Sequence, residues 1–160
     1  MNYKVPSGVR VGHIHLKVAS LARAVDFYQK VLGFEITQRF GESAVFLSAG
    51  GYHHHIGLNI WESQDGVAPA MGTTGLYHVA FLYPTRKDLA QVARHLMSLN
   101  VEWDGAADHG VSEALYLRDP DGNGLELYWD RPISEWPRDA MGGIAMYTRP
   151  LDLQGLLSEA

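Results

Sequence analysis

The chain has 160 residues, of which 46% are hydrophobic and 19% are charged, and these proportions are typical of a globular rather than a disordered protein. The net charge of -5, without any run of Lys or Arg, argues against a nucleic-acid partner, because phosphate binding needs a clustered basic surface. Cysteine is absent, so disulfides, thiolate metal sites and a cysteine nucleophile are excluded.

Neither a membrane span nor a secretory signal is expected from the sequence. No apolar run approaches the roughly 18 residues that a membrane-spanning helix needs. The first six residues lack the apolar stretch of a secretory signal peptide. We therefore expect a cytoplasmic protein without membrane contact.

The first half of the chain predicts one βαβββ unit. Residues 11–18 alternate polar and apolar side chains as a strand does, and Ser20 is a suitable N-cap for a helix over residues 21–28. Gly33 is a suitable end of this helix. Strand-like segments follow at residues 34–40, 44–47 and 52–61.

The second half predicts the same order of elements. Residues 76–82 form a strand-like segment, and Thr85 is a suitable cap for a helix that ends near Leu96. Short strands are expected at residues 101–103, 113–117 and 124–129, with a turn at residues 119–124.

An internal duplication explains this repeated order. His13 corresponds to His78, and residues 57–61 correspond to residues 124–128, at nearly the same separation along the chain. We therefore predict a single α+β domain over residues 1–160. It consists of modules at about residues 9–62 and 75–131, joined by a polar linker and followed by a C-terminal tail, residues 132–160.

Histidine and glutamate positions predict a metal site. The chain has eight histidines, and histidine without cysteine indicates ligation by nitrogen and oxygen. Any one of these side chains alone would more often be a surface or ion-paired residue. His13 and its repeat equivalent His78, with Glu126 late in the second module, match the two imidazoles and one carboxylate of non-heme Fe(II) sites. Three coordination positions then stay open for other ligands.

Four segments resemble the vicinal oxygen chelate superfamily, which groups glyoxalases, bleomycin-resistance proteins and extradiol dioxygenases. They are residues 11–18 (VGHIHLKV), 24–34 (AVDFYQKVLGF), 76–81 (LYHVAF) and 119–128 (DPDGNGLELY). The resemblance implies two βαβββ modules that form a half-open barrel-like, metal-binding cleft. It also implies that His13, His78 and Glu126 are the metal ligands.

Within this superfamily, residues 109–126 (HGVSEALYLRDPDGNGLE) are similar to the signature of catechol 2,3-dioxygenase-like enzymes. Ala107 departs from that signature. The similarity implies that His109 and Tyr116 hydrogen-bond the substrate. Residues 54–58 (HHIGL) are similar to the place of an acid–base histidine, and we assign this role to His55 because alternation places it on the face of His13. His53 shares that face, and the choice within the triplet stays open.

The resemblance implies an extradiol ring-cleaving dioxygenase that acts on a small catechol-type aromatic diol with O2. Fe(II) is the expected metal, with Mn, Ni or Zn as alternatives. Larger relatives contain two such module pairs, so we expect this chain to form a homodimer.

Three other functions are compatible with the superfamily. A glyoxalase-like isomerase needs a fourth ligand, and the repeat places Asn59 where a glutamate is expected. A fosfomycin-resistance-like thiol transferase uses three ligands, but the chain lacks an obvious Lys and Arg cluster for a phosphonate. A bleomycin-resistance-like binding module lacks the ligand set, which is present here.

Overall fold

The computed structural model describes residues 2–160, and the chain divides into two compact units, Met1–Val67 and Ala68–Ala160. Each unit is described by itself. Both combine an open β-sheet with a helix, so the predicted α+β class is confirmed, and no closed barrel forms within either unit over residues 2–160.

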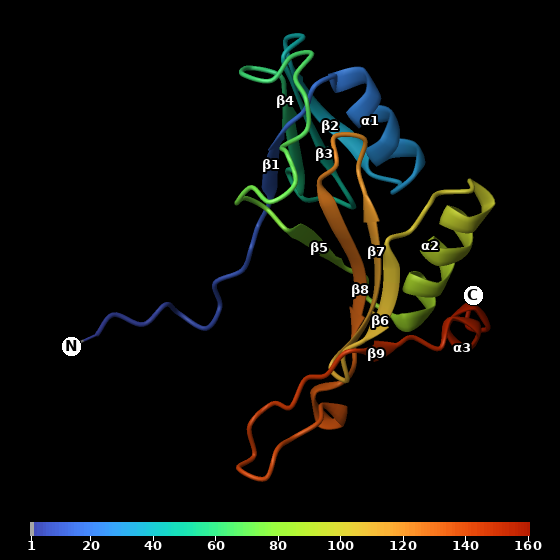
Figure 1. The fold of residues 1–160 in the computed structure, drawn as a ribbon. Coiled ribbons are helices and arrows are strands. Elements are labelled where there is room, and N and C mark those ends of the chain that lie inside the picture. The colour runs from blue at the N-terminus through green and yellow to red at the C-terminus, as the bar shows by residue number, and fades with distance from the viewer. Residues whose placement is uncertain (1) are drawn as a thin grey trace. The chain divides into compact units, whose positions relative to one another are not determined.

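The first unit has the predicted βαβββ order (Figure 1). Its sheet has the strand order β1-β4-β3-β2, in which β1 is parallel to β4 and the other neighbours are antiparallel. Its helix begins after Ser20, whose side chain accepts a hydrogen bond from the backbone N–H of Arg23. The elements are β1 (Ile14–Lys17), α1 (Leu21–Lys30), β2 (Glu35–Phe40), β3 (Ala44–Ser48) and β4 (Ile56–Asn59).

The core of the first unit is formed by the apolar sides of α1 and the sheet. Leu16 and Val18 are buried, as the alternation predicted, and Ile56 and Leu58 on the neighbouring strand are fully buried beside them. Tyr28 of α1 is also fully buried. The opposite side of β1 is thereby left to polar residues, including His15.

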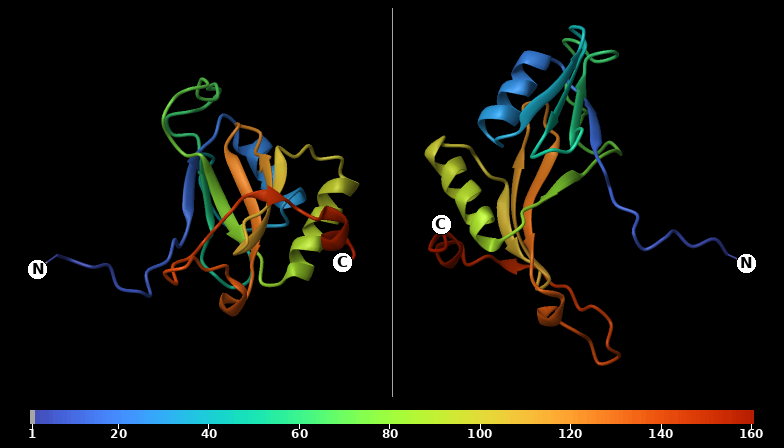
Figure 2. Two further views of the ribbon diagram at one scale, coloured as in Figure 1. Left: turned by 60° about the horizontal axis from the view of Figure 1, so that its bottom comes forward. Right: turned by 180° about the vertical axis from the view of Figure 1, so that it is seen from behind.

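The second unit repeats the module and adds a C-terminal segment (Figure 1). Its sheet has the order β5-β8-β7-β6-β9, and β5 is parallel to β8 as β1 is to β4. Figure 2 shows α3 beside α2 in both views. The elements are β5 (His78–Leu82), α2 (Arg86–Ser98), β6 (Gly105–Asp108), β7 (Ser112–Arg118), β8 (Gly124–Asp130), a 3₁₀ turn (Ile133–Glu135), β9 (Arg149–Pro150) and α3 (Leu153–Leu157).

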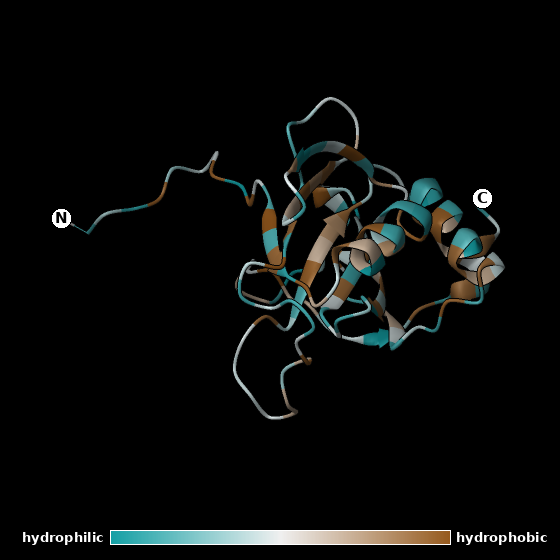
Figure 3. Ribbon diagram, turned by 90° about the horizontal axis from the view of Figure 1, so that it is seen from above, coloured by the Kyte–Doolittle hydropathy of each residue, from teal (hydrophilic) through white to brown (hydrophobic). Residues whose placement is uncertain are grey.

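Figure 3 shows hydrophilic and hydrophobic residues interspersed along the helical ribbons, as expected for helices with one apolar side that faces a core. Leu89 and Leu96 of α2 and Leu156 of α3 are fully buried. The tail is anchored through α3, because the Leu157 carbonyl accepts hydrogen bonds from the Arg94 guanidinium at 2.8 and 3.2 Å. Over residues 2–160, no helix has the length and apolar character needed to cross a membrane.

One predicted strand is misplaced. Residues 101–103 are not a strand, and β6 begins at Gly105 instead. The Val101 N–H closes the end of α2 by bonding the Leu96 carbonyl, whereas the Asp104 N–H bonds the Tyr116 carbonyl at 2.7 Å. Backbone hydrogen bonding to β7 therefore starts only at Asp104.

Replacing Thr85 by alanine is expected to destabilise the protein by about 1 kcal/mol, because Thr85 and Asp88 form a reciprocal capping box at the start of α2. The Thr85 hydroxyl accepts from the Asp88 N–H at 3.1 Å, and the Asp88 carboxylate accepts from the Thr85 N–H at 3.0 Å. Urea denaturation measures the loss. The control is Thr85→Ser, which keeps the hydroxyl. Equal stability of the alanine variant and the wild type would contradict the assignment.

Candidate functional site

Four predicted site residues lie in the second unit and form one chain of contacts. His78 begins β5, Tyr116 and Glu126 face each other across β7 and β8, and His109 lies just before β7. The His78 Nε2 is 3.0 Å from Glu126 Oε2, and the Tyr116 hydroxyl donates to Glu126 Oε1 at 2.8 Å. The His109 Nε2 lies 2.7 Å from the same hydroxyl. The structure therefore brings together residues that are up to 48 positions apart (78 to 126).

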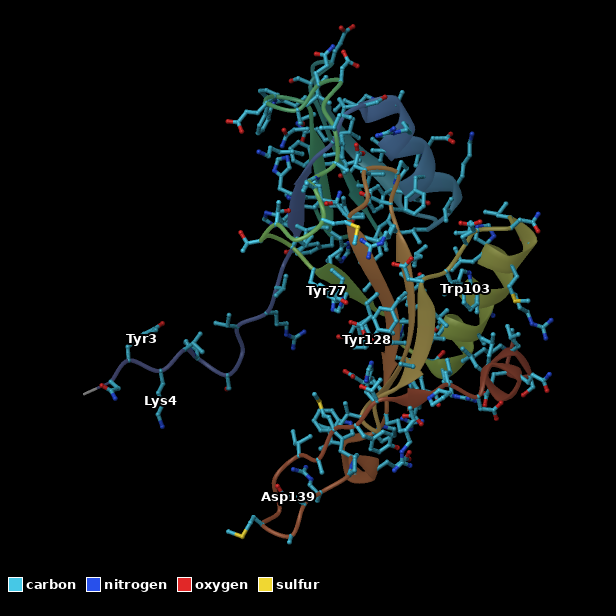
Figure 4. All side chains as sticks on the ribbon, in the orientation of Figure 1. Tyr3, Lys4, Tyr77, Trp103, Tyr128 and Asp139 are labelled. Atoms are coloured by element: carbon cyan, nitrogen blue, oxygen red, sulfur yellow. The ribbon has the colours of Figure 1, made fainter. Side chains whose placement is uncertain are left out.

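Close approach of β5 to β8 requires a glycine at position 124. Gly124 is the register partner of His78, and a Cβ atom added to Gly124 would collide with the Tyr77 carbonyl oxygen. Glycine alone lets the two backbones meet there. Figure 4 shows Tyr77 at the start of β5 and Tyr128 on β8. The Gly before the Leu-Glu pair thus positions His78 beside Glu126.

The contacts open into a pocket of about 350 Å³. Its lining includes His78, His109 and Tyr116 together with the aromatic ring of Tyr77. A concave site with aromatic side chains and a few converging polar groups suits a small organic ligand.

The site favours a protonated tyrosine at position 116. Partial burial and the carboxylate of Glu126 raise the pKa of the Tyr116 hydroxyl above its ordinary value. Partial burial and the Glu126 charge also raise the pKa of the Asp130 carboxyl. Tyr116 therefore keeps its proton around neutral pH and acts as a hydrogen-bond donor.

His78 and Glu126 fit a metal ion. Their facing atoms are 3.0 Å apart, which is about the separation expected for two ligand atoms with metal bonds of roughly 2.1 Å at a right angle. The Glu126 side chain is only 12% exposed, and His78 Nδ1 is buried without a hydrogen-bond partner among residues 2–160. Imidazole nitrogen with carboxylate oxygen is a donor set that divalent transition metals accept.

The third predicted ligand, His13, belongs to the first unit. It is exposed and lies directly before β1, not within it. In the part of the chain that the structure describes, no three His, Asp or Glu side chains gather closely enough to hold a metal. The complete triad of His13, His78 and Glu126 therefore stays a prediction.

His54, rather than His55, contacts His13 within the first unit. The rings of His54 and His13 are 4.3 Å apart between centroids, and the ring of His53 is 6.2 Å from that of His13. The alternation rule predicted His53 and His55 on this side. The contact of His54 departs from this rule, because β4 begins only at Ile56 and strand alternation does not extend to the triplet.

His55 is held by local polar contacts instead. Its Nδ1 accepts a hydrogen bond from the Ala49 N–H at 3.2 Å and lies 3.0 Å from the Ser48 hydroxyl. Asn59 is also used locally, since its side-chain oxygen accepts from the Trp61 N–H at 3.2 Å and the residue is 6% exposed. Asn59 therefore has a local structural role, and its absence from the ligand set stays a prediction.

Two tail residues contact His109, and sequence reasoning did not identify them. The Tyr147 carbonyl oxygen lies 3.1 Å from His109 Nδ1, and the Thr148 hydroxyl lies 3.2 Å from the same nitrogen. Neither residue belongs to a recognisable motif. The position of the tail beside β6, where Asp108 pairs with Arg149, brings them there.

A buried charge network supports the backbone around His109. Glu113, which is 5% exposed, accepts from Arg86 and from Arg131, each at 2.8 Å. Arg131 also donates to Asp108 at 2.7 Å. Partial burial alone would raise the pKa of Asp108, but hydrogen bonds from Arg131 and from the Gly110 N–H lower it overall. The residue before His109 is therefore fixed in its ionised form.

Known proteins are similar to this chain over most of its length. The Bacillus subtilis (strain 168) catechol-2,3-dioxygenase is 41% identical over 151 residues, 94% of this chain and 52% of that protein. Biphenyl-2,3-diol 1,2-dioxygenase 3 of Rhodococcus globerulus is 33% identical over 76% of this chain and 63% of that protein. The chain thus spans about half to less than two thirds of these curated relatives.

Two further comparisons bear on metal and fold. A manganese-dependent 2,3-dihydroxybiphenyl 1,2-dioxygenase from Geobacillus genomosp. 3 is 26% identical over 76% of this chain and 36% of that protein. The crystal structure of lactoylglutathione lyase from Agrobacterium tumefaciens, at 24% identity, superposes with a TM-score of 0.60 over 78% of this chain and 95% of that one. The latter likeness shows the fold alone.

The predicted resemblance is confirmed by a family match over most of the chain. The family model described as Glyoxalase/Bleomycin resistance protein/Dioxygenase superfamily matches residues 10–127, which cover most of both modules. The repeated modules and the first relatives agree with this match. The chain belongs to the glyoxalase, bleomycin resistance protein and dioxygenase superfamily.

Proposed function

We propose that this protein is an extradiol ring-cleaving dioxygenase that acts on a catechol-type aromatic diol with O2. The observation that carries the proposal is the contact chain His78–Glu126–Tyr116–His109, in which His78, Tyr116 and His109 line one pocket. The 41% identity to a catechol-2,3-dioxygenase supports the reaction class. The predicted homodimer stays a prediction.

The proposal includes a divalent metal held by His78 and Glu126, with His13 as the third ligand. Fe(II) is the preferred metal, while the manganese-dependent relative makes Mn(II) the main alternative. When bound, the metal would lower the pKa of the diol hydroxyls and hold the diol and O2 together.

The protein's own groups would then orient the diol and move protons. Tyr116 keeps its proton, so its hydroxyl is suited to donate a hydrogen bond to a substrate oxygen. His109 touches this hydroxyl through Nε2 and is suited to supply or remove a proton there.

A second acid–base histidine is proposed within the triplet. The sequence assigned this role to His55, and the contact between the rings of His54 and His13 supports His54 instead. The Nδ1 of His55 already accepts from the backbone N–H of Ala49, which leaves only its Nε2 for chemistry.

Anaerobic loading with Fe(II), followed by air and a panel of catechols, tests the proposed function. We expect O2 uptake and a yellow muconic semialdehyde type of product. Parallel loading with Mn(II) identifies the preferred metal. The proposal would be contradicted if no metal and no catechol in the panel gave O2 uptake or a yellow product. Turnover of a hemithioacetal without O2 would instead favour an isomerase.

A further inference from the structure

The C-terminal segment before β9 approaches the Nδ1 edge of the His109 ring, whereas Tyr116 contacts Nε2. The Tyr147 N–H donates to the His109 carbonyl at 3.2 Å, and the Tyr147 carbonyl lies 3.1 Å from His109 Nδ1. The tail therefore contacts both the backbone and the ring of His109. Figure 4 shows Asp139 farther out in the loop that leads to this segment.

The contacts at Nδ1 identify which nitrogen of His109 carries a hydrogen. A carbonyl oxygen only accepts, so the contact with Tyr147 is attractive only when Nδ1 carries a hydrogen. The Thr148 hydroxyl, 3.2 Å from Nδ1, also accepts in that state. With hydrogen on Nε2 alone, the Nδ1 lone pair would face the lone pairs of the Tyr147 carbonyl.

We propose that Tyr147 is a positioning residue whose carbonyl holds His109 as the Nδ1–H tautomer, so that proton exchange at His109 occurs only at Nε2. The inference rests on the proposed function for its catalytic meaning. The tautomer itself follows from contacts within the second unit.

The tautomer of His109 determines where the hydrogen of the Tyr116 hydroxyl points. The Tyr116 hydroxyl has one hydrogen and two neighbouring acceptors, His109 Nε2 at 2.7 Å and Glu126 Oε1 at 2.8 Å. While the hydroxyl donates to Glu126, Nε2 must carry a hydrogen and donate to the hydroxyl oxygen. With hydrogen on Nδ1 alone, the hydroxyl turns from Glu126 and donates to Nε2. When Nε2 gains a proton, the ring donates to the hydroxyl oxygen, and the Tyr116 hydrogen turns to Glu126. Nδ1 keeps its hydrogen in both arrangements.

The side chain of Tyr147 fixes the position of its carbonyl. A Cβ atom added to Gly110 would lie 2.6 Å from the Tyr147 ring and 2.8 Å from Pro137, so the ring packs closely on the backbone after His109. The guanidinium carbon of Arg149 also lies over the Tyr147 ring, 4.2 Å from its centre. Tyr147→Ala removes this packing, whereas Tyr147→Phe keeps the ring.

Imidazole ¹⁵N NMR of the full metal-free chain at about pH 8, where an unperturbed histidine is neutral, tests the tautomer directly. His109→Gln identifies the signals of His109 by their loss. The wild type and Tyr147→Phe are expected to show a protonated Nδ1 and an unprotonated Nε2. Tyr147→Ala is expected to show a mixture of tautomers. A protonated Nε2 in the wild type, or no change in a folded Tyr147→Ala, would overturn the inference.

The metal-loaded protein gives a second readout. Tyr147→Ala is expected to lower kcat at least about tenfold with little change in KM, because an incorrect histidine tautomer impairs proton transfer rather than binding. Tyr147→Phe should restore the wild-type rate. If no variant is active but the NMR result holds, the proposed function fails and the tautomer assignment stands.

Discussion

Replacing Glu126 by alanine is expected to weaken divalent-metal binding more than about 100-fold and to abolish ring cleavage. Loss of groups that merely support metal ligands costs 10–100-fold in affinity, so loss of a ligand should exceed that. The removed carboxylate faces His78 Nε2 at 3.0 Å and accepts from Tyr116 at 2.8 Å. Calorimetric titration with Fe(II) under anaerobic conditions measures the affinity.

Two matched variants separate ligation from structure. Glu126→Gln keeps an acceptor for Tyr116 but removes the charge, and it should bind metal weakly as well. Glu102→Ala removes an exposed glutamate of the same unit and should bind metal like the wild type. Wild-type metal affinity in a folded Glu126→Ala variant would show that Glu126 is not a ligand.

Replacing Arg131 by methionine is expected to destabilise the protein by about 2–3 kcal/mol. Removing one partner of a buried ion pair costs about 3–5 kcal/mol. The expected loss is smaller here because the Arg131 and Asp108 side chains are about a fifth exposed. Glu113 keeps Arg86 as a partner, but Asp108 loses its guanidinium. In a chain of this size the melting temperature should fall by roughly 5–10 °C.

Arg118→Met is the matched control for stability. Arg118 pairs with Asp104 at 2.8 Å, but both side chains are about half exposed, so the pair contributes about 0–1 kcal/mol. The ionised Asp108 carboxylate contributes to the free energy of unfolding above the unfolded aspartate pKa of about 3.9. This contribution is lost as the pH falls through the lower pKa of the folded state. Equal urea midpoints for Arg131→Met and the wild type at pH 7 would contradict the buried-network account.

Much of the fold could be predicted from local patterns in the sequence. Both helices begin where the caps Ser20 and Thr85 predicted, because a cap is a local hydrogen-bonding property. The repeat predicted that β1 and β5 would occupy equivalent places. In the structure each of them is parallel to the last strand of its module. The place of β6 could not be predicted, because it depends on where β7 offers a partner.

The candidate site was only partly accessible from sequence. Glu126 and Tyr116 face each other because strand register places them there, and the family pattern identified both. Which histidine of residues 53–55 lies nearest His13 depends on the turn before β4, where side chains do not alternate as they do in a strand. Tyr147 comes to His109 through packing of the tail, a tertiary contact without a local signal.

Anomalous diffraction at the iron edge, from crystals of the Fe(II)-loaded chain grown without oxygen, tests the metal site most directly. The account predicts one metal peak at about 2.0–2.2 Å from His78 Nε2 and from Glu126 Oε2, with His13 as the third protein ligand. A peak bound only by His53 and His54, or a peak that Glu126 does not contact, would contradict it.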